Sequence, residues 1–476
     1  MSATGETKQR SRKLHYDWLK VAEEPAQYKS TGKQGSLFNV NGNGNGQTAF
    51  RDPAFGDNKS LPVHRWVPWI AGYSASFVDD VISAYLPDRK TSLVLDPFCG
   101  VGTTLLQAIL HGQDAIGFEI NPYPALAARA KLGAIKINLG ELDANIAAMQ
   151  AVSIRWKTAA APKEITPPPL KSRILFFSPN VERQVLHALA FINGIKSKAI
   201  ADLFRIAFGA VMVSFSNYSY EPSLGSRPAA GKALIEDANV GEVLLTKLHQ
   251  IRADISWIRE ETRGKHLGAG RVINADFFNG SVEALESNSV DLMITSPPYM
   301  NNYHYVRNTR PQLYWLNFIS SPGEQKHLET NNFGQYWQTV READPVALVF
   351  ENRDLEKILK RLRQTRIDKG AYGGPGWANY VASYFNDCCR FMSALRRVLA
   401  RGGVGVVVIG NSIIQGINIR TENILGEIGV MQGLILEGVH CIREKRVGAS
   451  ITQSSVRQGE RSSAVLSESA VIVRKR

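Results

Sequence analysis

The stretch from Thr91 to His111 constrains the fold of this chain more than any other. It opens with a short apolar run rich in Val and Leu and then turns through Asp96-Pro97-Phe98-Cys99-Gly100-Val101-Gly102. From Thr103 onward, apolar residues recur at the spacing of an α-helix. A strand, a glycine turn and a helix in this order are typical of folds with a parallel sheet. We therefore expect a doubly wound, Rossmann-like α/β sheet.

The glycine turn indicates a ligand site. Gly100 and Gly102 can adopt conformations closed to residues with a Cβ, and the following helix start offers unpaired N–H groups. A second strand, Ala115–Phe118, ends on Glu119, where a carboxylate can accept hydrogen bonds from ribose hydroxyls. Alternatively, Glu119 only caps the helix that begins near Pro122. Glu119 follows the loop by about twenty residues, and this combination favours a nucleotide-type cofactor.

A nicotinamide cofactor fits the loop poorly. The dinucleotide fingerprint requires a third glycine at the helix start, and Leu105 occupies that position here.

A second motif, Thr295-Ser296-Pro297-Pro298-Tyr299, follows the apolar run from Ser289 to Thr295. The prolines fix the chain beyond the strand and remove two backbone donors, which leaves carbonyl acceptors. An exocyclic amine is a poor nucleophile because its lone pair is delocalised into the ring. If the Ser296 hydroxyl and the Pro297 carbonyl accept its hydrogens, the lone pair becomes available for attack. The alternative interpretation is a surface turn, which Pro-Pro more often marks.

Together the two motifs resemble motifs I and IV of the S-adenosylmethionine-dependent DNA amino-methyltransferases, which modify cytosine N4 or adenine N6. The resemblance implies S-adenosylmethionine as cofactor, with Asp96 near its methionine moiety and Glu119 on its ribose. It implies duplex DNA as partner, with Tyr299 stacked on a flipped target base. Further cofactor contacts would come from the glycine loop, namely Phe98, Gly100, Gly102 and Thr103. Catalysis would fall to the corner, namely Ser296, Pro297, Pro298 and Tyr299.

Flanking segments are similar to the same family. Residues 64–86, with Ser74, resemble the region that closes over the methionine end. Residues 274–277 resemble the third-strand motif, in which Asp276 would lie near the adenine. Val404–Ser412 is expected to be the fifth strand and Ser469–Lys475 the last.

The first residue of the corner bears on the target base. In this family Ser-Pro-Pro-Tyr is commoner among cytosine-N4 enzymes, whereas Asp or Asn at the first position is commoner among adenine-N6 enzymes. Ser296 therefore favours cytosine N4 in a restriction-modification setting, with a cognate restriction endonuclease as a further partner. Adenine-N6 methylation, RNA methylation and a non-catalytic nucleic-acid-binding subunit stay open as alternatives. Cytosine-C5 chemistry is excluded because Tyr299 stands where a thiolate nucleophile is needed.

Composition agrees with a nucleic-acid partner. The 476 residues carry a formal net charge of +13, which favours a polyanion. Four cysteines and nine histidines show neither metal spacing nor a disulfide framework, so we expect no metal and a reducing compartment. The polar N-terminus and the lack of a membrane-spanning apolar run lead us to expect a cytoplasmic protein without a membrane partner.

We expect four parts along the chain. Residues 1–60 form a basic flexible arm that contains Asn41-Gly42-Asn43-Gly44-Asn45-Gly46. Residues 61–137 form the cofactor-binding half of the methyltransferase domain. Residues 138–265 form a helical insertion, with helices at 180–192, 199–215 and 240–261. Residues 266–476 form the catalytic half, which contains a second insertion at about residues 317–380.

Either insertion can hold target recognition. The second carries basic residues between Arg353 and Lys369, which can neutralise phosphates or form the solvated face of an ordinary amphipathic helix. Arg307 and Arg310, shortly after the corner, can bind phosphates beside a flipped nucleotide. Gln453, Arg457 and Arg461 are further DNA contacts to consider.

Overall fold

The structure is a computed structural model that describes residues 50–51, 55–69, 72–87, 91–220, 223–301, 303–446 and 465–476. Most of the expected N-terminal arm lies outside the described residues, as do Gln453, Arg457 and Arg461.

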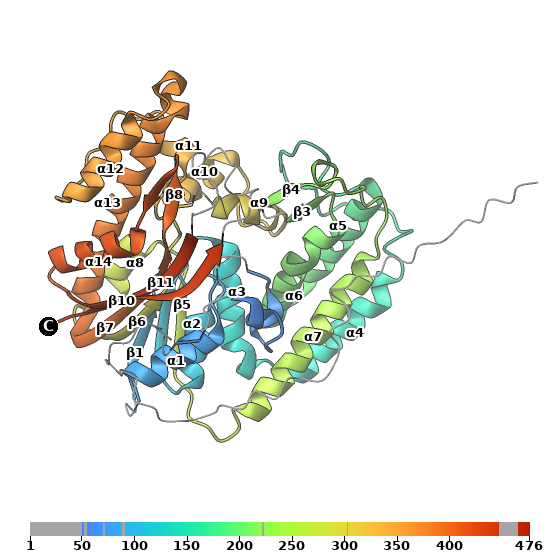
Figure 1. The fold of residues 1–476 in the computed structure, drawn as a ribbon. Helices are drawn as coiled ribbons and strands as arrows, with labels where there is room; N and C mark the ends of the chain where they lie inside the picture. Colours follow the sequence, from blue (N-terminus) through green and yellow to red (C-terminus); the bar gives the residue numbers. More distant parts are fainter. Residues whose placement is uncertain are drawn as a thin grey trace, which may run out of the picture.

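A seven-stranded sheet forms the centre of the molecule, with strand order β10-β11-β7-β6-β1-β2-β5 (Figure 1). Its strands are β1 (Leu93–Asp96), β2 (Asp114–Phe118), β5 (Gly270–Ile273), β6 (Val290–Thr295), β7 (Leu399–Gly410), β10 (Ile435–Arg446) and β11 (Val465–Arg474). The pairs from β5 to β7 are parallel, and β11 runs antiparallel to both β7 and β10. On one side of β1 the sheet continues through β2 and β5, and on the other side it continues through β6 and β7. This arrangement confirms the prediction of a doubly wound α/β sheet.

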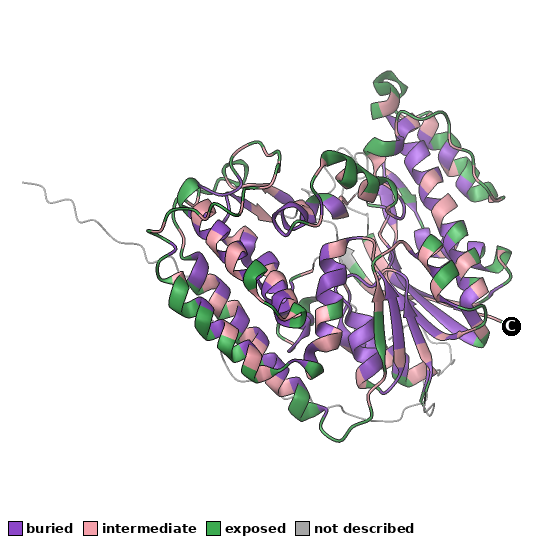
Figure 2. Ribbon diagram, turned by 180° about the vertical axis from the view of Figure 1, so that it is seen from behind, coloured by how far each residue is buried: buried purple, intermediate pink, exposed green. Residues whose placement is uncertain are grey.

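Successive side chains along each strand point to opposite faces of the sheet, and both faces are buried. Val94 packs on the side that carries α1 (Ala75–Tyr85), α2 (Thr103–Leu110) and α3 (Pro122–Gly133). Leu95 packs on the opposite side with α8 (Phe277–Ala284), α13 (Gly374–Val398) and α14 (Thr421–Met431). Figure 2 shows the buried strands between these layers and the exposed outer faces of the peripheral helices. Burial on both faces explains the apolar runs that the strands show in the sequence.

The chain between α3 and β5 adds a helical layer beyond α3. It comprises α4 (Leu139–Ser153), α5 (Pro179–Gly194), α6 (Lys198–Val211) and α7 (Val240–Glu261), with a hairpin of β3 (Tyr218–Tyr220) and β4 (Leu224–Ser226). α6 packs on α3, and α4, α5 and α6 all contact α7. The three helices expected here are present, whereas α4 and the hairpin were not predicted.

A second group of helices follows β6. It contains α9 (Tyr305–Trp315), α10 (Pro322–Thr330), α11 (Trp337–Val340) and α12 (Arg353–Arg363), which lead into α13. On α12, Leu355, Leu359 and Leu362 are buried against a core that includes α13 residues. Thus α12 is an amphipathic helix with a solvated basic face, which was one of the two readings of this segment.

Short elements complete the fold. They are a hairpin of β8 (Ser412–Ile414) and β9 (Ile417–Ile419), and the 3-10 helices η1 (Phe55–Lys59), η2 (His64–Trp66), η3 (Ala134–Lys136), η4 (Met212–Phe215), η5 (Pro228–Ala230) and η6 (Ile367–Tyr372). Among the described residues, no helix combines the length and the apolar character that crossing a membrane requires.

Candidate functional site

The tips of β1 and β6 are fastened together by a buried carboxylate. Asp96 Oδ1 accepts hydrogen bonds from Thr295 Oγ1 at 2.6 Å and from the Phe98 backbone N–H at 3.1 Å. Asp96 Oδ2 accepts a bond from the Tyr73 hydroxyl at 3.0 Å. Burial raises the pKa of Asp96, and these bonds oppose that shift. The glycine loop after β1 and the Ser-Pro-Pro-Tyr corner after β6 therefore lie next to each other.

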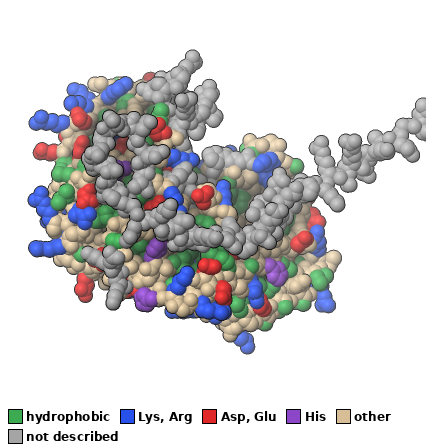
Figure 3. Space-filling view, turned by 60° about the horizontal axis from the view of Figure 1, so that its bottom comes forward, with side chains coloured by type: hydrophobic (Ala, Val, Ile, Leu, Met, Phe, Trp, Pro, Cys, Tyr) green, Lys and Arg blue, Asp and Glu red, His purple; other side chains and the backbone are tan. Residues whose placement is uncertain are grey.

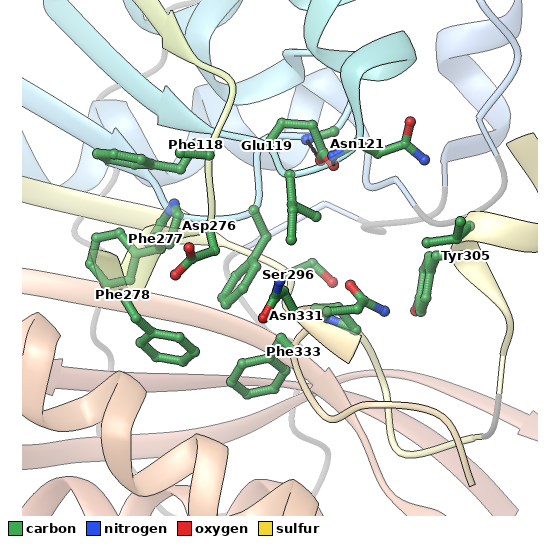
Figure 4. Close-up of a pocket in the computed structure, with 18 of the residues that line it drawn as sticks. Phe118, Glu119, Asn121, Asp276, Phe277, Phe278, Ser296, Tyr305, Asn331 and Phe333 are labelled. Carbon is green, nitrogen blue, oxygen red and sulfur yellow. Dashed lines mark hydrogen bonds between the residues drawn. The ribbon is translucent and has the colours of Figure 1, made fainter. Parts of the chain in front are cut away.

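A pocket lies at these tips and encloses about 750 Å³ of non-protein space, part of it open to solvent. In the view of Figure 4, Phe277 and Phe278 lie at one end and Tyr305 at the other, with Ser296 between them. The lining residues are Trp69, Pro97, Phe98, Gly100, Phe118, Glu119, Ile120, Asn121, Ala275, Asp276, Phe277, Phe278, Ser296, Pro298, Tyr305, Val306, Asn331, Asn332 and Phe333.

Glu119 binds the glycine loop from across the strand ends. Its carboxylate accepts the Gly100 N–H at 3.0 Å and the Asn121 N–H at 2.8 Å. Burial raises the pKa of Glu119 to about 7, against the lowering effect of both bonds. The N-cap of α3 is Asn121, whose side chain accepts the Tyr123 N–H. Glu119 is therefore not the residue that caps α3, which was the alternative reading of this acid.

The predicted cofactor residues divide into two groups. Phe98, Gly100, Glu119 and Asp276 line the pocket. Asp96, Gly102, Thr103 and Ser74 do not line it and instead support the loops around it. Ser74 is the N-cap of α1, and Thr103 is the buried first residue of α2.

Gly102 has a packing role. Its φ of 83° is in the left-handed region, and a Cβ there would lie 2.9 Å from Ala128 Cβ on α3. Only glycine combines this backbone conformation with such close packing. The loop can therefore lie directly on α3.

Aromatic rings form much of the pocket wall. Phe98 packs edge-on against Phe333, with ring centroids 5.0 Å apart, and Phe277 packs edge-on against Phe118 at 5.4 Å. Asp276 is the N-cap of α8 and accepts the Asn279 N–H at 3.0 Å. This end of the pocket offers flat apolar surfaces with one carboxylate beside them.

Part of the wall was not foreseen from the sequence. Asn331, Asn332 and Phe333 reach the pocket from the turn after α10, in the second group of helices. Two residues of α13 hold this turn: Asp387 accepts the Gly334 N–H at 2.9 Å, and Tyr384 packs edge-on against Phe333. Trp69 and Asn121 are further lining residues that the motifs did not reveal, whereas Tyr305, which follows the corner closely, was expected as a residue that could line the base pocket.

The Ser-Pro-Pro-Tyr corner is held by two tyrosines. Tyr384 donates to the Pro298 carbonyl at 2.8 Å, and the Tyr299 N–H donates to the Tyr305 hydroxyl at 3.2 Å. Ser296 and Pro298 line the pocket, and Pro297 between them is buried. No residue in the described part of the chain donates to the Pro297 carbonyl. The corner thus keeps one carbonyl and the Ser296 hydroxyl as acceptors.

Tyr299 lies against the end of β7. A Cβ built on Gly410 would lie 3.3 Å from its ring, and the Ser296 hydroxyl donates to its oxygen at 3.4 Å. Burial raises the pKa of Tyr299. Its hydroxyl therefore stays protonated at neutral pH.

A family model for N6/N4 DNA methylases matches residues 13–129 of the chain. The matched residues include the glycine loop and Glu119. Over this segment the chain is similar to the N6/N4 DNA methylase family. The strand order and the two apposed motifs of this methylase agree with that assignment.

Curated relatives extend the similarity over most of the chain. Type II methyltransferase M.BsoBI from Geobacillus stearothermophilus is 24% identical over 75% of this methylase and 75% of its own length. Type II methyltransferase M.MvaI from Kocuria varians is 23% identical over 70% and 73%, respectively.

A solved structure, rRNA methyltransferase aviRa from Streptomyces viridochromogenes, covers 87% of this methylase and 85% of its own chain with 12% identity and a TM-score of 0.25. A score this low adds nothing to the assignment.

Within the described ranges of the methylase, no group of three or more His, Cys, Asp or Glu side chains is arranged to hold a metal ion. The four cysteines are free, and three of them are buried.

Proposed function

We propose that this methylase transfers a methyl group from S-adenosylmethionine to N4 of cytosine in duplex DNA, within a type II restriction-modification system. One observation carries the proposal: Ser296 of the corner lines the same pocket as Glu119 and Gly100 of the cofactor loop. The two relatives described as type II methyltransferases support the biological setting.

The pocket residues fit S-adenosylmethionine. Each Glu119 oxygen accepts one backbone N–H and keeps a further lone pair for a ribose hydroxyl. Phe98, Phe277 and Phe333 offer flat surfaces for the adenine ring, with Asp276 beside them. When bound, the cofactor supplies an electrophilic methyl group on a positively charged sulfur.

The corner provides the acceptors that the target amine needs. The Ser296 hydroxyl and the Pro297 carbonyl would each accept one amine hydrogen and turn the nitrogen lone pair toward the methyl donor. These dipoles also stabilise the positive charge that develops on the nitrogen. Because Tyr384 and Tyr305 fix the corner, little reorganisation is needed during the reaction. Tyr299 would stack on the extruded base.

The target base is tested by product analysis. We would incubate the full-length protein with labelled S-adenosylmethionine and plasmid DNA, digest the DNA to nucleosides and separate them. The expected product is N4-methylcytosine. Recovery of N6-methyladenine alone would replace the cytosine assignment with adenine N6, and incorporation into total RNA but not DNA would overturn the DNA proposal.

A further inference from the structure

In a short irregular segment ahead of α5, buried and exposed residues alternate. Leu170, Ser172, Ile174 and Phe176 are buried or partly buried, whereas Lys171, Arg173 and Leu175 between them are exposed. Leu175 is 64% exposed. Both cations of the segment are therefore accessible to solvent.

This segment is fixed to α9, the helix that follows the catalytic corner. Arg310 of α9 donates to the Lys171 carbonyl at 3.0 Å. At the other end of the segment, Phe177 packs edge-on against Trp315 of α9, with centroids 4.9 Å apart. The two attachments hold the segment beside α9, although 130-odd residues separate them in sequence.

α9 in turn belongs to the pocket. Its residues Tyr305 and Val306 line the pocket, and Asn121 Nδ2 donates to Thr309 Oγ1 at 2.7 Å. Arg307 directly follows Val306 and is exposed. The field of Arg307 and Arg310, added to the larger effect of burial, lowers the pKa of His304 to about 4. Both arginines therefore lie near the start of α9, next to the corner.

We name Lys171, Arg173 and Arg307 the α9 ridge. In the described part of the chain, none of the three forms an ion pair with a carboxylate. Exposed cations that have no acidic partner and lie beside an apolar side chain match the chemistry of a nucleic-acid backbone.

The other basic segment, α12, differs from α9 in its position, because none of the α12 residues lines the pocket. Three of the five cations of α12 lie in its last turn and both of its acids, Asp354 and Glu356, lie in its first, which is the arrangement that the helix dipole favours. Lys357 pairs with Asp354, and Arg363 donates to the Val346 carbonyl. The turn after α10, at the start of this second group of helices, forms a wall of the cofactor pocket. Figure 1 shows α9 between the helical insertion on one side and α12 and α13 on the other.

Charges of both signs lie among the described residues on the face seen in Figure 3. There, Lys and Arg side chains are interspersed with Asp and Glu, so the net charge of +13 is not concentrated on that face. Mixed charges of this kind do not select a polyanion.

We infer that the α9 ridge binds the DNA backbone beside the target nucleotide, and that the helical insertion is therefore the lobe that docks on the duplex. The inference rests on the proposed function for its choice of partner. From the sequence alone, either insertion could hold target recognition. The inference assigns DNA docking to the helical insertion.

The test compares two triple variants that each remove three exposed cations. Lys171→Gln/Arg173→Gln/Arg307→Gln alters the ridge, and Lys360→Gln/Arg361→Gln/Lys369→Gln alters the segment around α12. Binding of a labelled 20-base-pair duplex is followed by fluorescence anisotropy from 50 to 200 mM salt. Each lost phosphate contact should reduce the slope of log K against log salt by about 0.9. We expect a reduction of about 2 to 3 for the ridge variant and little change for the α12 variant.

Equal losses in both variants, a loss in the α12 variant alone, or no duplex binding by the wild-type protein would overturn the inference. Calorimetric binding of S-adenosylmethionine and the thermal unfolding midpoint confirm that each variant is folded. The readout does not depend on methyl transfer. A wild-type protein that binds the duplex but methylates no DNA would refute the proposed function while the ridge comparison still stands.

Discussion

The Tyr384 hydroxyl donates a 2.8 Å hydrogen bond to the carbonyl of Pro298. Tyr384 belongs to α13 and is fully buried, so a helix from the far side of the sheet fixes the corner after β6. The bond engages the second proline carbonyl of the corner and leaves that of Pro297 as an acceptor. It also links the corner to Phe333 of the cofactor pocket, against which Tyr384 packs.

Replacing Tyr384 with Phe should lower kcat by about tenfold, because losing one hydrogen bond of about 0.5–1.5 kcal/mol lets the corner move. The Kd for S-adenosylmethionine should stay within about twofold, since the ring remains against Phe333. Single-turnover methylation and calorimetry measure the two quantities separately. Equal loss of cofactor affinity and of rate would instead point to general collapse of the pocket.

Replacing Ser296 with Ala removes one of the two acceptors proposed for the amine. By analogy with the loss of one oriented dipole at other active sites, we expect kcat to fall by about 100-fold. Cofactor binding should persist, because Ser296 is the first residue of the corner and does not contact Glu119 or Gly100 through any hydrogen bond of the described residues. An unchanged kcat would remove the Ser296 hydroxyl from the mechanism.

Glu119 should make both stability and cofactor affinity depend on pH. Because burial raises its pKa from 4.5 to about 7, the folded protein retains a proton that the unfolded chain releases. Its contribution to stability is therefore fully present below pH 4.5 and is lost as the pH rises through 7. Ribose hydroxyls would donate to the ionised carboxylate, so cofactor affinity should rise by up to about tenfold per pH unit below 7 and level off above it.

Titrating Glu119→Gln in parallel isolates this group. The difference in unfolding free energy between wild type and variant, measured in urea from pH 5 to 8, should change in the stated direction. In calorimetry, the variant should lose the pH dependence of cofactor binding. A wild-type affinity that is flat over this range would contradict the assigned role of Glu119.

The fold could be predicted because the apolar runs and the glycine turn in the sequence correspond to the strands of the sheet and to the loop after β1. The buried strands read as apolar runs, and the glycine turn after β1 fixes where the sheet starts. The ends of the last strands were less clear: β7 begins at Leu399 rather than Val404, because the chain already pairs with β6 there. α4 was missed although Leu142, Ile146 and Met149 form a buried helical stripe, since alanines and polar residues between them weaken the pattern.

The candidate site could be predicted only where a motif contributes the residue. Phe98, Glu119 and Ser296 follow strands directly, so strand order brings them together. Asn331 and Phe333 reach the pocket through the packing of their turn on α13, and no local signal encodes that contact. Asp96 shows the converse case. Its motif suggested a ligand contact, whereas its carboxylate accepts bonds from Thr295 and Tyr73 outside the pocket lining.

Replacing Thr295 with Val should cost about 1–3 kcal/mol of unfolding free energy, because it removes a donor from the buried Asp96 carboxylate. Thr295→Ser keeps the hydroxyl and is the matched control, for which we expect a smaller loss. Urea unfolding at neutral pH measures both. If the two variants are equally destabilised, packing of the Thr295 methyl group, rather than its hydrogen bond, joins the strand tips.

Replacing Gly102 with Ala should destabilise the protein more than replacing Gly231 with Ala. Both glycines have positive φ, 83° and 68°, so both substitutions carry a backbone penalty of about 1–2 kcal/mol. Only at Gly102 does the new Cβ also meet Ala128, at 2.9 Å, whereas nothing lies within 4 Å at Gly231. Overpacking of this kind adds about 1–3 kcal/mol. Gly102→Ala should also weaken cofactor binding, since the glycine loop must shift away from α3. Equal unfolding midpoints for the two variants would show that the loop can move without cost.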